Sequence, residues 1–500
     1  MAFKDITGFF LFVLATATVG PFLFGYHLSE LNAPIATISC RERASAKIDI
    51  SLPQCIPMTP AQIGLVSSIF TLGGLCGALG AGPLSANHGR YRTMLGTTFF
   101  HILGPIFEAL AMSISTLAVG RFISGIGAGA ALVVVPIYIS ELAPPKEKGF
   151  FGALTQVMTN VGILTTQVLG LFFSKGQYWR LILAVAGGFG ALQAVGLLLG
   201  GQESPKWLTD HGKPVPAKRI LRKLRGHAVD IDAEIRGWGV SSSETVDAEE
   251  ETLLHNDQNA ASTEDIGNRG QGHLESATKS VAREMLGPLQ VLRHPNSRRA
   301  VFVVMMVMLA QQLTGINSVV MYGVDVLADL LAANSAILNV GVAALNVVVT
   351  TGSAPLVDRL GRRTCLLISL AVMGISSLLL GIGIQRHVSV LSAVSVITFV
   401  AGFALGLGPI PFILSSELVS AEAVGSTQSW ALAANWISTF VVAQFFPIVN
   451  AYLGGGKTYF IFAVVALLSG IFIAMFLPES KDKATADEVW GRTKTASRLD

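Results

Sequence analysis

The side chains of this sequence that could do chemistry are carboxamides placed inside long apolar stretches. Asn and Gln donate and accept hydrogen bonds without carrying a charge, which suits a partner that presents many hydroxyl groups. An amide that faced hydrocarbon would lack a partner and would be costly to place there. The pattern therefore predicts a polar site buried between helices, formed by Gln156, Gln167, Gln311, Gln312, Asn317, Asn346 and Asn435.

A sugar is the chemical class that fits such a set, because its hydroxyls donate and accept at once. Gln311, Gln312 and Asn317 share one apolar stretch, which Gly315 interrupts, as in the broken helices of transporter sites. The alternative for each amide is that it only joins neighbouring helices. The sequence leaves that choice open.

Composition sets the environment of these amides. Of the 500 residues, 51% are hydrophobic and only 13% are charged, against roughly 25% in soluble proteins. This indicates a membrane protein. The net charge of +3 is small and dispersed, which excludes nucleic acid as a partner. No nucleophile with a matching base and no phosphate-binding loop can be assigned, so the chain is predicted not to be an enzyme and not to use ATP.

The four cysteines form no disulfide framework and show no metal-site spacing, and neither a metal nor a cofactor is predicted. Cys40 and Cys55 share one loop between apolar stretches. They can pair in an oxidising lumen or remain free thiols, and both alternatives stay open.

Twelve apolar stretches divide the chain, each near the length of roughly 20 residues that a bilayer requires. Six precede a charged linker and six follow it: 6–36, 61–84, 93–115, 117–141, 150–173 and 179–200, then 299–325, 334–357, 364–384, 389–417, 424–450 and 458–477. The expected domains are two six-helix bundles and two cytosolic segments: bundles 1–200 and 299–477, linker 201–298 and tail 478–500.

Both termini and the linker are predicted to be cytosolic because the short loops on their side are rich in basic residues, as cytosolic loops are. These residues are Arg90, Arg92, Lys146, Lys148, Arg359, Arg362 and Arg363.

Three dipeptides recur in the second half at nearly one offset, 272, 276 and 276 residues. Gly89-Arg90, Glu141-Leu142 and Glu203-Ser204 return as Gly361-Arg362, Glu417-Leu418 and Glu479-Ser480. Each pair follows the second, fourth or sixth apolar stretch of its half. This predicts two parallel six-helix repeats, the arrangement that supports alternating access.

An ordered series of motifs gives the chain a family resemblance. The motifs are Gly120-Arg121-Phe122, the run from Pro136 to Glu141, Trp179-Arg180, the run from Glu203 to Leu208, the run from Gln311 to Asn317, the run from Asp358 to Arg363, the run from Gly408 to Pro411, and Pro478-Glu479-Ser480. The chain resembles the sugar porters of the major facilitator superfamily and is similar to fungal vacuolar sugar-transporter-like proteins. The resemblance implies an all-α membrane protein with the major facilitator fold, in which twelve transmembrane helices form two bundles.

The resemblance also implies which residues contact the sugar. The amides that match sugar-bonding positions of the family are Gln156, Gln311, Gln312, Asn317, Asn346 and Asn435, and the apolar walls are Phe403, Phe412, Trp436 and Tyr322. Two positions depart from the family pattern. Ala404 stands where an acidic residue is common, and Met321 replaces the first of two tyrosines. These departures leave the identity of the substrate open.

Proton coupling would require a titratable group in the first bundle. Proton-linked relatives carry an Asp after the Gly-Tyr pair of the first helix, where this chain has His27, with Glu30 on the same helix face. A relay of His27 and Glu30 beside Arg121 is one interpretation. The other is that Glu30 lies near the lumenal end of the helix and His27 only bonds a neighbour. A facilitator is therefore favoured over a proton symporter.

Charged residues at the cytosolic helix ends are predicted, by the same resemblance, to form ion pairs between the bundles that break when the inside opens. They are Glu141, Lys148, Glu203, Asp358, Arg359, Arg362, Arg363, Glu417 and Glu479.

The linker begins with amphipathic basic segments, and its polar, acidic middle, which is expected to be disordered, holds a predicted sorting signal. Glu249 precedes Leu253 and Leu254 by three intervening residues, the pattern of an acidic dileucine signal. It indicates sorting adaptors as partners and a vacuolar or endosomal membrane as the location, in preference to the plasma membrane.

The prediction is thus a monomeric carrier of a small neutral sugar, with a hexose expected, that works by alternating access. A sugar sensor of the same fold that does not transport is the alternative, and Ala404 is mildly in its favour.

Overall fold

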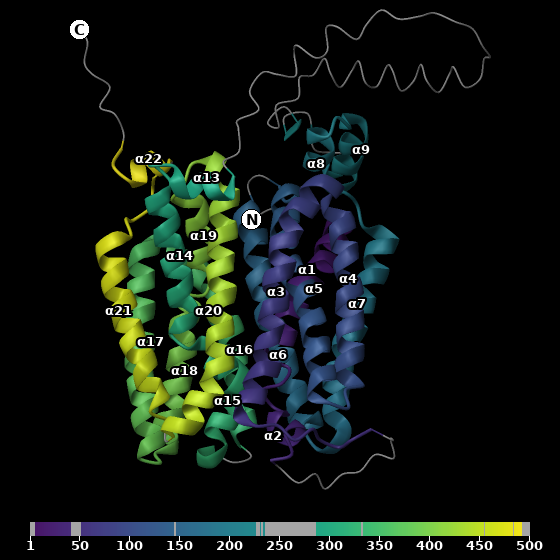
Figure 1. Ribbon diagram of the computed structural model, residues 1–500. Helices are drawn as coiled ribbons and strands as arrows, with labels where there is room; N and C mark the ends of the chain where they lie inside the picture. The colour runs from purple at the N-terminus through teal and green to yellow at the C-terminus, as the bar shows by residue number, and fades with distance from the viewer. Residues whose placement is uncertain are drawn as a thin grey trace, which may run out of the picture.

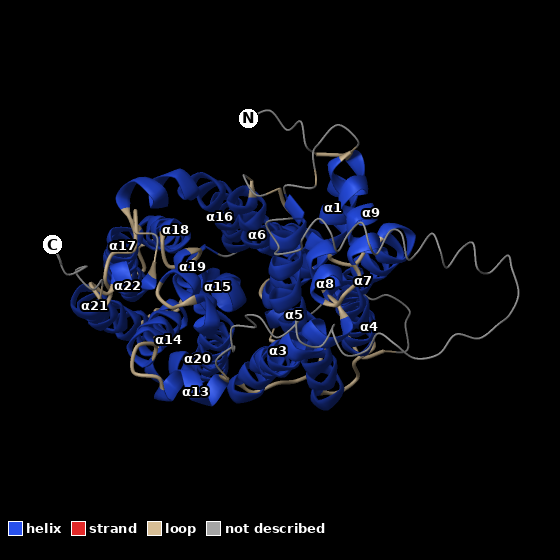
Figure 2. Ribbon diagram, turned by 90° about the horizontal axis from the view of Figure 1, so that it is seen from above, coloured by secondary structure: helices blue, strands red, loops and turns tan. Residues whose placement is uncertain are grey.

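The computed structural model describes residues 6–41, 52–144, 147–226, 231, 234–235, 287–331, 334–454, 456–483 and 485–492. The regular structure within these ranges is entirely helical. Long helices stand side by side in two groups, which are clearest when the molecule is seen along the helices (Figures 1 and 2). The predicted sorting residues Glu249, Leu253 and Leu254 lie outside the described residues.

The first group is built from the first 200 residues. Its long helices are α1 (Gly8–Ser29), α3 (Pro60–His88), α4 (Arg90–Ala109), α5 (Ile114–Leu142), α6 (Lys148–Phe173) and α7 (Trp179–Gly200). The short helices are α2 (Ile35–Ile38), a 3-10 turn Gly176–Tyr178, α8 (Pro205–Asp210) and α9 (Pro214–Arg225). Because α2 lies at one end of the molecule and α8 and α9 at the other, these ends are called the α2 end and the α9 end below (Figure 1).

The second group follows the linker. Its main helices are α14 (Arg298–Leu313), α15 (Ile316–Leu331), α16 (Asn334–Leu360), α17 (Arg362–Gln385), α18 (Ser389–Leu405), α19 (Ile410–Glu417), α20 (Val424–Leu453) and α21 (Thr458–Phe476). Three short pieces complete it: α13 (Pro288–Arg293), a 3-10 turn Ala421–Ala423 and α22 (Ala486–Val489).

Eleven spans in the described part of the chain are long and apolar enough to cross a membrane. The twelfth predicted segment is α4, which packs against α5 and α7 within the first group. It is less apolar than the others because it contains Arg90, Arg92 and Glu108. It also begins and ends earlier than the predicted stretch 93–115.

The first apolar stretch was predicted to be one helix over 6–36, and this is wrong at its C-terminal end. Helix α1 stops at Ser29, the chain turns, and α2 forms a separate short helix. Pro34 explains the break, because the residue before a proline avoids the helical conformation and proline lacks a donor for the next turn.

Two of the predicted membrane segments are broken helices. The segment 299–325 divides into α14 and α15 at Gly315, whose φ is +94° and where a Cβ atom would lie 2.4 Å from the Phe462 ring. The segment 389–417 divides into α18 and α19, where the chain unwinds between Leu405 and Ile410. The first break was predicted from the glycine, and the second is set by the glycines and Pro409 between the two helices.

Within the first group, α3 and α5 approach each other through glycine faces. A Cβ atom at Gly73, Gly77, Gly125 or Gly129 would lie 1.9–2.1 Å from a backbone oxygen of the facing helix. Small residues of this kind let two membrane helices approach each other closely. These two helices therefore form a rigid base for the side chains on their other faces.

The two groups meet along two helix pairs, α3 with α20 and α6 with α16 (Figure 2). Ser68 Oγ donates to Gln444 Oε1 at 2.8 Å across the first pair. At the α2 end, Arg41 pairs with Asp325 at 3.1 Å, and Asn32 Oδ1 accepts from the Val324 amide at 3.0 Å. These contacts lie along the shared interface and at the α2 end.

The α9 end shows why the dipeptides repeat. Arg90 pairs with Glu141 at 2.8 Å, and the Glu203 carboxylate accepts from the Arg90 amide at 2.8 Å. The second group repeats this: Arg362 pairs with Glu417 at 3.1 Å, and Glu479 accepts from the Arg362 amide at 2.7 Å.

These ion pairs differ from the expectation, because they close within each group of helices. The predicted pairing between bundles is not seen among the described residues. Arg363 donates to the Ala474 carbonyl, Arg359 accepts from Lys481 through its backbone oxygen, and Lys148 is exposed at the start of α6. The side chain of Asp358 is not among those described. The ion pairs hold helix ends inside one bundle, because a carboxylate at a helix N-terminus satisfies free amides there.

Gly89 is the position where this arrangement can be tested. Its φ of +98° is strained for any residue with a side chain, and a Cβ atom there would lie 2.1 Å from Glu203 Oε2. We expect Gly89→Ala to cost at least about 1 to 2 kcal/mol, the usual penalty for an L-residue in left-handed backbone. The melting temperature of the purified protein measures it.

Gly80→Ala is the matched control, because Gly80 lies within α3 and a Cβ atom there would meet nothing within 4 Å. That variant should melt at or above the wild-type temperature. Equal melting temperatures for the two variants would contradict the packing of Glu203 against Gly89.

Candidate functional site

One side-chain amide, that of Gln311, connects the break between α14 and α15 to the break between α18 and α19. The Gln311 side chain, on the last turn of α14, donates to the carbonyls of Leu407 at 2.6 Å and Gly408 at 3.0 Å. These carbonyls lie in the unwound stretch between α18 and α19, where helix bonding has been lost. Gln311 therefore replaces the backbone partners that the break removed.

Three further amides extend this network. Gln312 and Asn435 donate to Gln311 Oε1 at 3.3 and 2.5 Å, and Asn317 donates to Gln312 Oε1 at 2.6 Å. Both N–H groups and both acceptor positions of Gln311 are thus used inside the protein. In the part of the chain that the structure describes, Asn317 Oδ1, Asn435 Oδ1 and one N–H of Gln312 have no protein partner. These three atoms of the network around Gln311 can receive a hydroxylated ligand without breaking a bond.

A second amide network crosses from one bundle to the other. Asn160, on α6, donates to Thr350 at 2.9 Å and exchanges longer contacts of 3.3 and 3.5 Å with Asn346, both on α16. Gln156 donates to Asn160 at 3.4 Å from the preceding turn of α6. Gln156 and Asn346 were predicted, whereas Asn160 and Thr350 were missed. The signal for Asn160 was present, since it lies four residues after Gln156 in the same apolar stretch.

The predicted aromatic walls divide into two kinds. Trp436 is buried between the bundles with Phe70 and Phe24, and half-buried Phe412 packs against the same cluster. Tyr322 instead donates its hydroxyl to the Ala443 carbonyl at 2.7 Å inside the second bundle, and Phe403 packs against the core of that bundle. Trp436, Phe412 and Tyr322, whose side chain also contacts Ser67 on α3, are therefore the aromatics placed where the bundles meet. Met321 and Ala404 are both buried, as apolar residues are expected to be.

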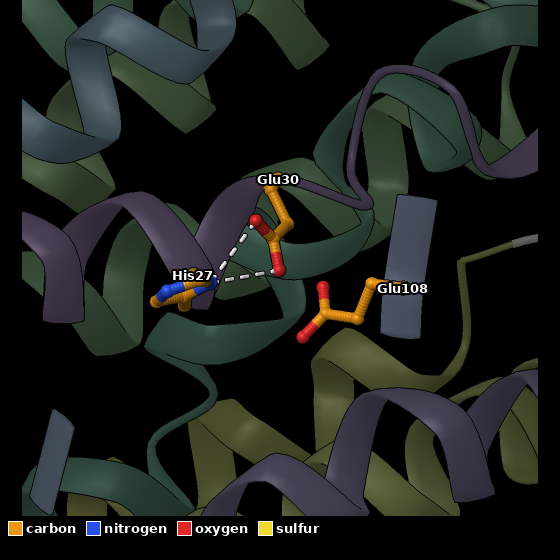
Figure 3. Close-up of side chains that lie close together, drawn as sticks. All are labelled: His27, Glu30 and Glu108. Atoms are coloured by element: carbon orange, nitrogen blue, oxygen red, sulfur yellow. Dashed lines mark hydrogen bonds and ion pairs between the residues drawn. The ribbon is translucent and has the colours of Figure 1, made fainter. Parts of the chain in front are cut away.

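The residues predicted as a proton relay lie together inside the first bundle. His27 Nδ1 is 3.1 Å from both carboxylate oxygens of Glu30, and the Arg121 guanidinium pairs with Glu30 and donates to the His27 carbonyl at 2.7 Å (Figure 3). The structure adds Glu108, from α4, whose carboxylate faces Glu30 (Figure 3). All four side chains are 0–1% exposed, so the cluster is sealed from solvent.

Sequence reasoning missed Glu108, together with His101 on the same helix. A charged residue in an apolar stretch is the signal that could have found Glu108. His101 lies over His27, with the two rings parallel and their centroids 6.1 Å apart.

A disulfide bond joins Cys40 and Cys55 at the α2 end. The chain next to Cys55 is also held by the first turn of α7 and the residues before it. Gln177, Trp179 and Arg180 donate to the carbonyls of Leu52, Gln54 and Pro53 at 2.7, 2.9 and 2.8 Å. The disulfide and these hydrogen bonds hold the chain near Arg41 in place. Arg41 itself forms the ion pair with Asp325 of the second bundle.

Comparison with known proteins decides the family. Residues 13–490 match the family model described as "Sugar (and other) transporter". The chain belongs to the sugar transporter family. The resemblance inferred from the motifs is therefore confirmed.

Two yeast proteins are among the similar relatives of this transporter. A probable metabolite transport protein of Saccharomyces cerevisiae is 33% identical, with 97% of this chain and 96% of the relative covered. Vacuolar protein sorting-associated protein 73 of the same yeast is 30% identical, with 95% of each chain covered. The facilitated glucose transporter member 3 of Bos taurus is 29% identical over 100% of this chain and 96% of the relative.

The solved structures confirm the fold of the transporter. A partially occluded inward-open conformation of the xylose transporter XylE from E. coli superposes with a TM-score of 0.71 at 21% identity. The match covers 96% of this chain and all of the other. The transporter therefore has the major facilitator fold, as predicted.

Gln311 and Gln312 are adjacent in sequence but should respond differently to substitution. Gln311→Ala leaves two buried carbonyls without partners, at about 1 to 3 kcal/mol each, so the melting temperature should fall. Gln312→Ala removes only contacts between side chains and should melt close to the wild type. Thermal unfolding in detergent distinguishes them, and an equal loss in both variants would contradict the role assigned to Gln311.

Proposed function

We propose that the protein carries a small neutral sugar, with a hexose as the expected substrate, across a membrane by alternating access. The observation that supports this most directly is the amide network around the two broken helices. It leaves two carbonyl oxygens and one N–H, from Asn317, Asn435 and Gln312, ready for hydroxyl groups. Trp436 and Phe412 offer apolar faces at the junction of the bundles. The facilitated glucose transporter among the relatives supports the same substrate class.

Alternating access is supported by where the bundles touch. The hydrogen bonds between them run through Asn160, Ser68 and Asn32, from the middle of the helices to the α2 end. The ion pairs at the α9 end close within each bundle. This is the arrangement expected when the α2 end is shut and the bundles can separate at the α9 end. We place the α9 end in the cytosol, with both termini, because the short basic loops lie there.

An equilibrative mode is proposed in preference to proton symport. Coupling requires a titratable group that meets water and substrate during the cycle. His27, Glu30 and Arg121 are instead sealed together between α1, α4 and α5 and are bonded to one another. Buried side chains that are bonded to one another in this way are better suited to holding helices together than to conducting protons.

The transport test uses purified protein in proteoliposomes and a panel of radiolabelled sugars. A hexose should enter until its concentrations inside and outside are equal. Gln312→Ala and Asn317→Ala should each lose about 1 to 3 kcal/mol of binding, roughly 5- to 150-fold in affinity. Binding of the sugar without uptake would favour the sensor alternative, and neither binding nor uptake of any sugar would refute the proposal.

The choice between equilibrative transport and proton symport is tested by imposing a pH gradient on the same vesicles. A facilitator equilibrates sugar with or without the gradient, so the final level should not change. His27→Asn should likewise leave the final level unchanged. Accumulation above equilibrium in the wild type that disappears in His27→Asn would establish the relay instead.

A vacuolar or endosomal membrane is the proposed location, and sorting adaptors are the proposed partners of the linker. Glu249, Leu253 and Leu254 match an acidic dileucine signal, and one relative carries a vacuolar sorting name. The transporter is proposed to act as a monomer, because the site is formed by the two bundles of one chain.

The location is tested with a fluorescent fusion. Replacing both Leu253 and Leu254 by Ala should move the protein from vacuolar or endosomal membrane to the cell surface. Thr252→Ala, which changes an intervening position, should leave the location unchanged. A double variant that stays in the wild-type compartment would show that the motif does not act as a signal.

A further inference from the structure

The sealed cluster in the first bundle contains more polar atoms than its own bonds satisfy. Among the described residues, His27 Nε2, Glu108 Oε2, Arg121 Nε and both ring nitrogens of His101 are buried without a hydrogen-bond partner. Buried polar atoms are normally paired, and an unpaired group costs about 1 to 3 kcal/mol. Of these atoms, Glu108 Oε2 belongs to a carboxylate that faces Glu30, and it is open to a further partner.

The geometry of the cluster suits a metal ion. One ligand atom each from His27, Glu30 and Glu108 can be chosen so that all three lie within 4.8 Å of one another. Figure 3 shows the two carboxylates facing each other, with His27 Nδ1 directed at Glu30. Atoms about 2 Å from a common centre would be separated by no more than about 4 Å, so small side-chain shifts suffice.

The electrostatic balance points to a cation. Two carboxylates face each other, and Arg121 supplies one positive charge. Helices α1 and α4 both end here, at Ser29 and Ala109, and each C-terminus carries about half a negative charge. Arg180 offsets part of the α4 end by donating to the Ala109 carbonyl at 2.7 Å. The cluster therefore stays negative by between about one and two charges, which favours a divalent ion.

We propose that His27, Glu30 and Glu108 bind a divalent transition-metal ion, for which Zn²⁺ is the best match. Zn²⁺ binds imidazole nitrogen and carboxylate oxygen. In some zinc sites three protein ligands hold the ion and a fourth coordination position is filled by another group. His101 lies beside His27 with both nitrogens unbonded and is the candidate for that fourth position.

The surrounding residues act as the outer shell of this site. Ser124, on α5, donates to Glu108 Oε1 at 2.6 Å, which leaves Oε2 for the ion. Arg121, also on α5, holds Glu30 and the end of α1 through the His27 carbonyl. Such contacts orient the ligands of a metal site. The ion would tie α1 to α4, with α5 as the support, and would make this end of the first bundle rigid.

The experiment measures metal in tag-free, full-length protein purified from cells grown with Zn²⁺. Mass spectrometry of the metal content should give close to one Zn²⁺ per chain. Because the site is fully buried, the ion should leave slowly in chelator, and the melting temperature should fall as it leaves. Protein purified without metal and then titrated with Zn²⁺ or Mn²⁺ should regain one equivalent. A wild-type protein that holds no metal and takes up none would overturn the proposal.

Variants assign the ion to this cluster. Glu108→Gln and His27→Gln keep the shape of the cluster and should each lose the bound equivalent. Gln193→Leu is the matched control, because Gln193 is also a buried polar residue with unpaired side-chain atoms, and it lies outside the ligand set on α7. This control should retain the metal. Full retention of the equivalent in Glu108→Gln would overturn the site, even if the protein transports sugar as proposed.

Discussion

A polar group inside either helix bundle needs a partner within the protein, because the surrounding hydrocarbon offers none. The constraint is most severe where a helix breaks. The chain unwinds before α15 and again before α19, and the second break leaves the Leu407 and Gly408 carbonyls without helical partners. One side chain, Gln311, satisfies both. The candidate binding site follows from that bond, since Gln312, Asn317 and Asn435 are arranged around the Gln311 oxygen.

The same constraint explains the ends of the bundles. A helix that starts at the membrane surface has free amides, and Glu203 and Glu479 accept from those at the starts of α4 and α17. The carboxylates come close only because Gly89 and Gly361 have no side chain and adopt positive φ. Arg90 and Arg362 then reach back to Glu141 and Glu417. Two copies of one packing solution therefore account for the three repeated dipeptides.

The contacts within the first bundle differ in kind from the contacts between the two bundles. Inside the first bundle, glycine faces bring α3 and α5 into backbone contact, and the His27 cluster ties α1 to α4 and α5. Between the bundles, the described contacts include amide pairs such as Asn160 with Asn346, the ion pair between Arg41 and Asp325, and the Trp436 ring. Helix α3 also approaches the α20 backbone at Gly64, where a Cβ atom would lie 2.4 Å from the Gln444 oxygen. Surface ion pairs and long amide contacts are weak. This distribution of contacts fits the proposed rocking of the bundles about a central site, because each bundle keeps its own packing when the contacts between them are lost.

The sequence by itself determined the membrane class, eleven of the twelve spans clearly, the repeat and the family, because apolar length and dipeptide spacing are local properties of the chain. It also selected Gln311, Gln312 and Asn317 as candidate site residues, since amides in an apolar stretch next to Gly315 are unusual wherever they occur. Only the tertiary structure decided what each amide does. Gln311 donates both its N–H groups to backbone carbonyls 96 and 97 residues away, and Asn346 meets an amide 186 residues away, neither of which spacing can predict. The same holds for Glu108, which is one acidic residue in α4 until packing places it against Glu30 and His27. Which atoms remain free to bind a ligand depends on contacts between distant helices, and those contacts exist only in the folded bundle.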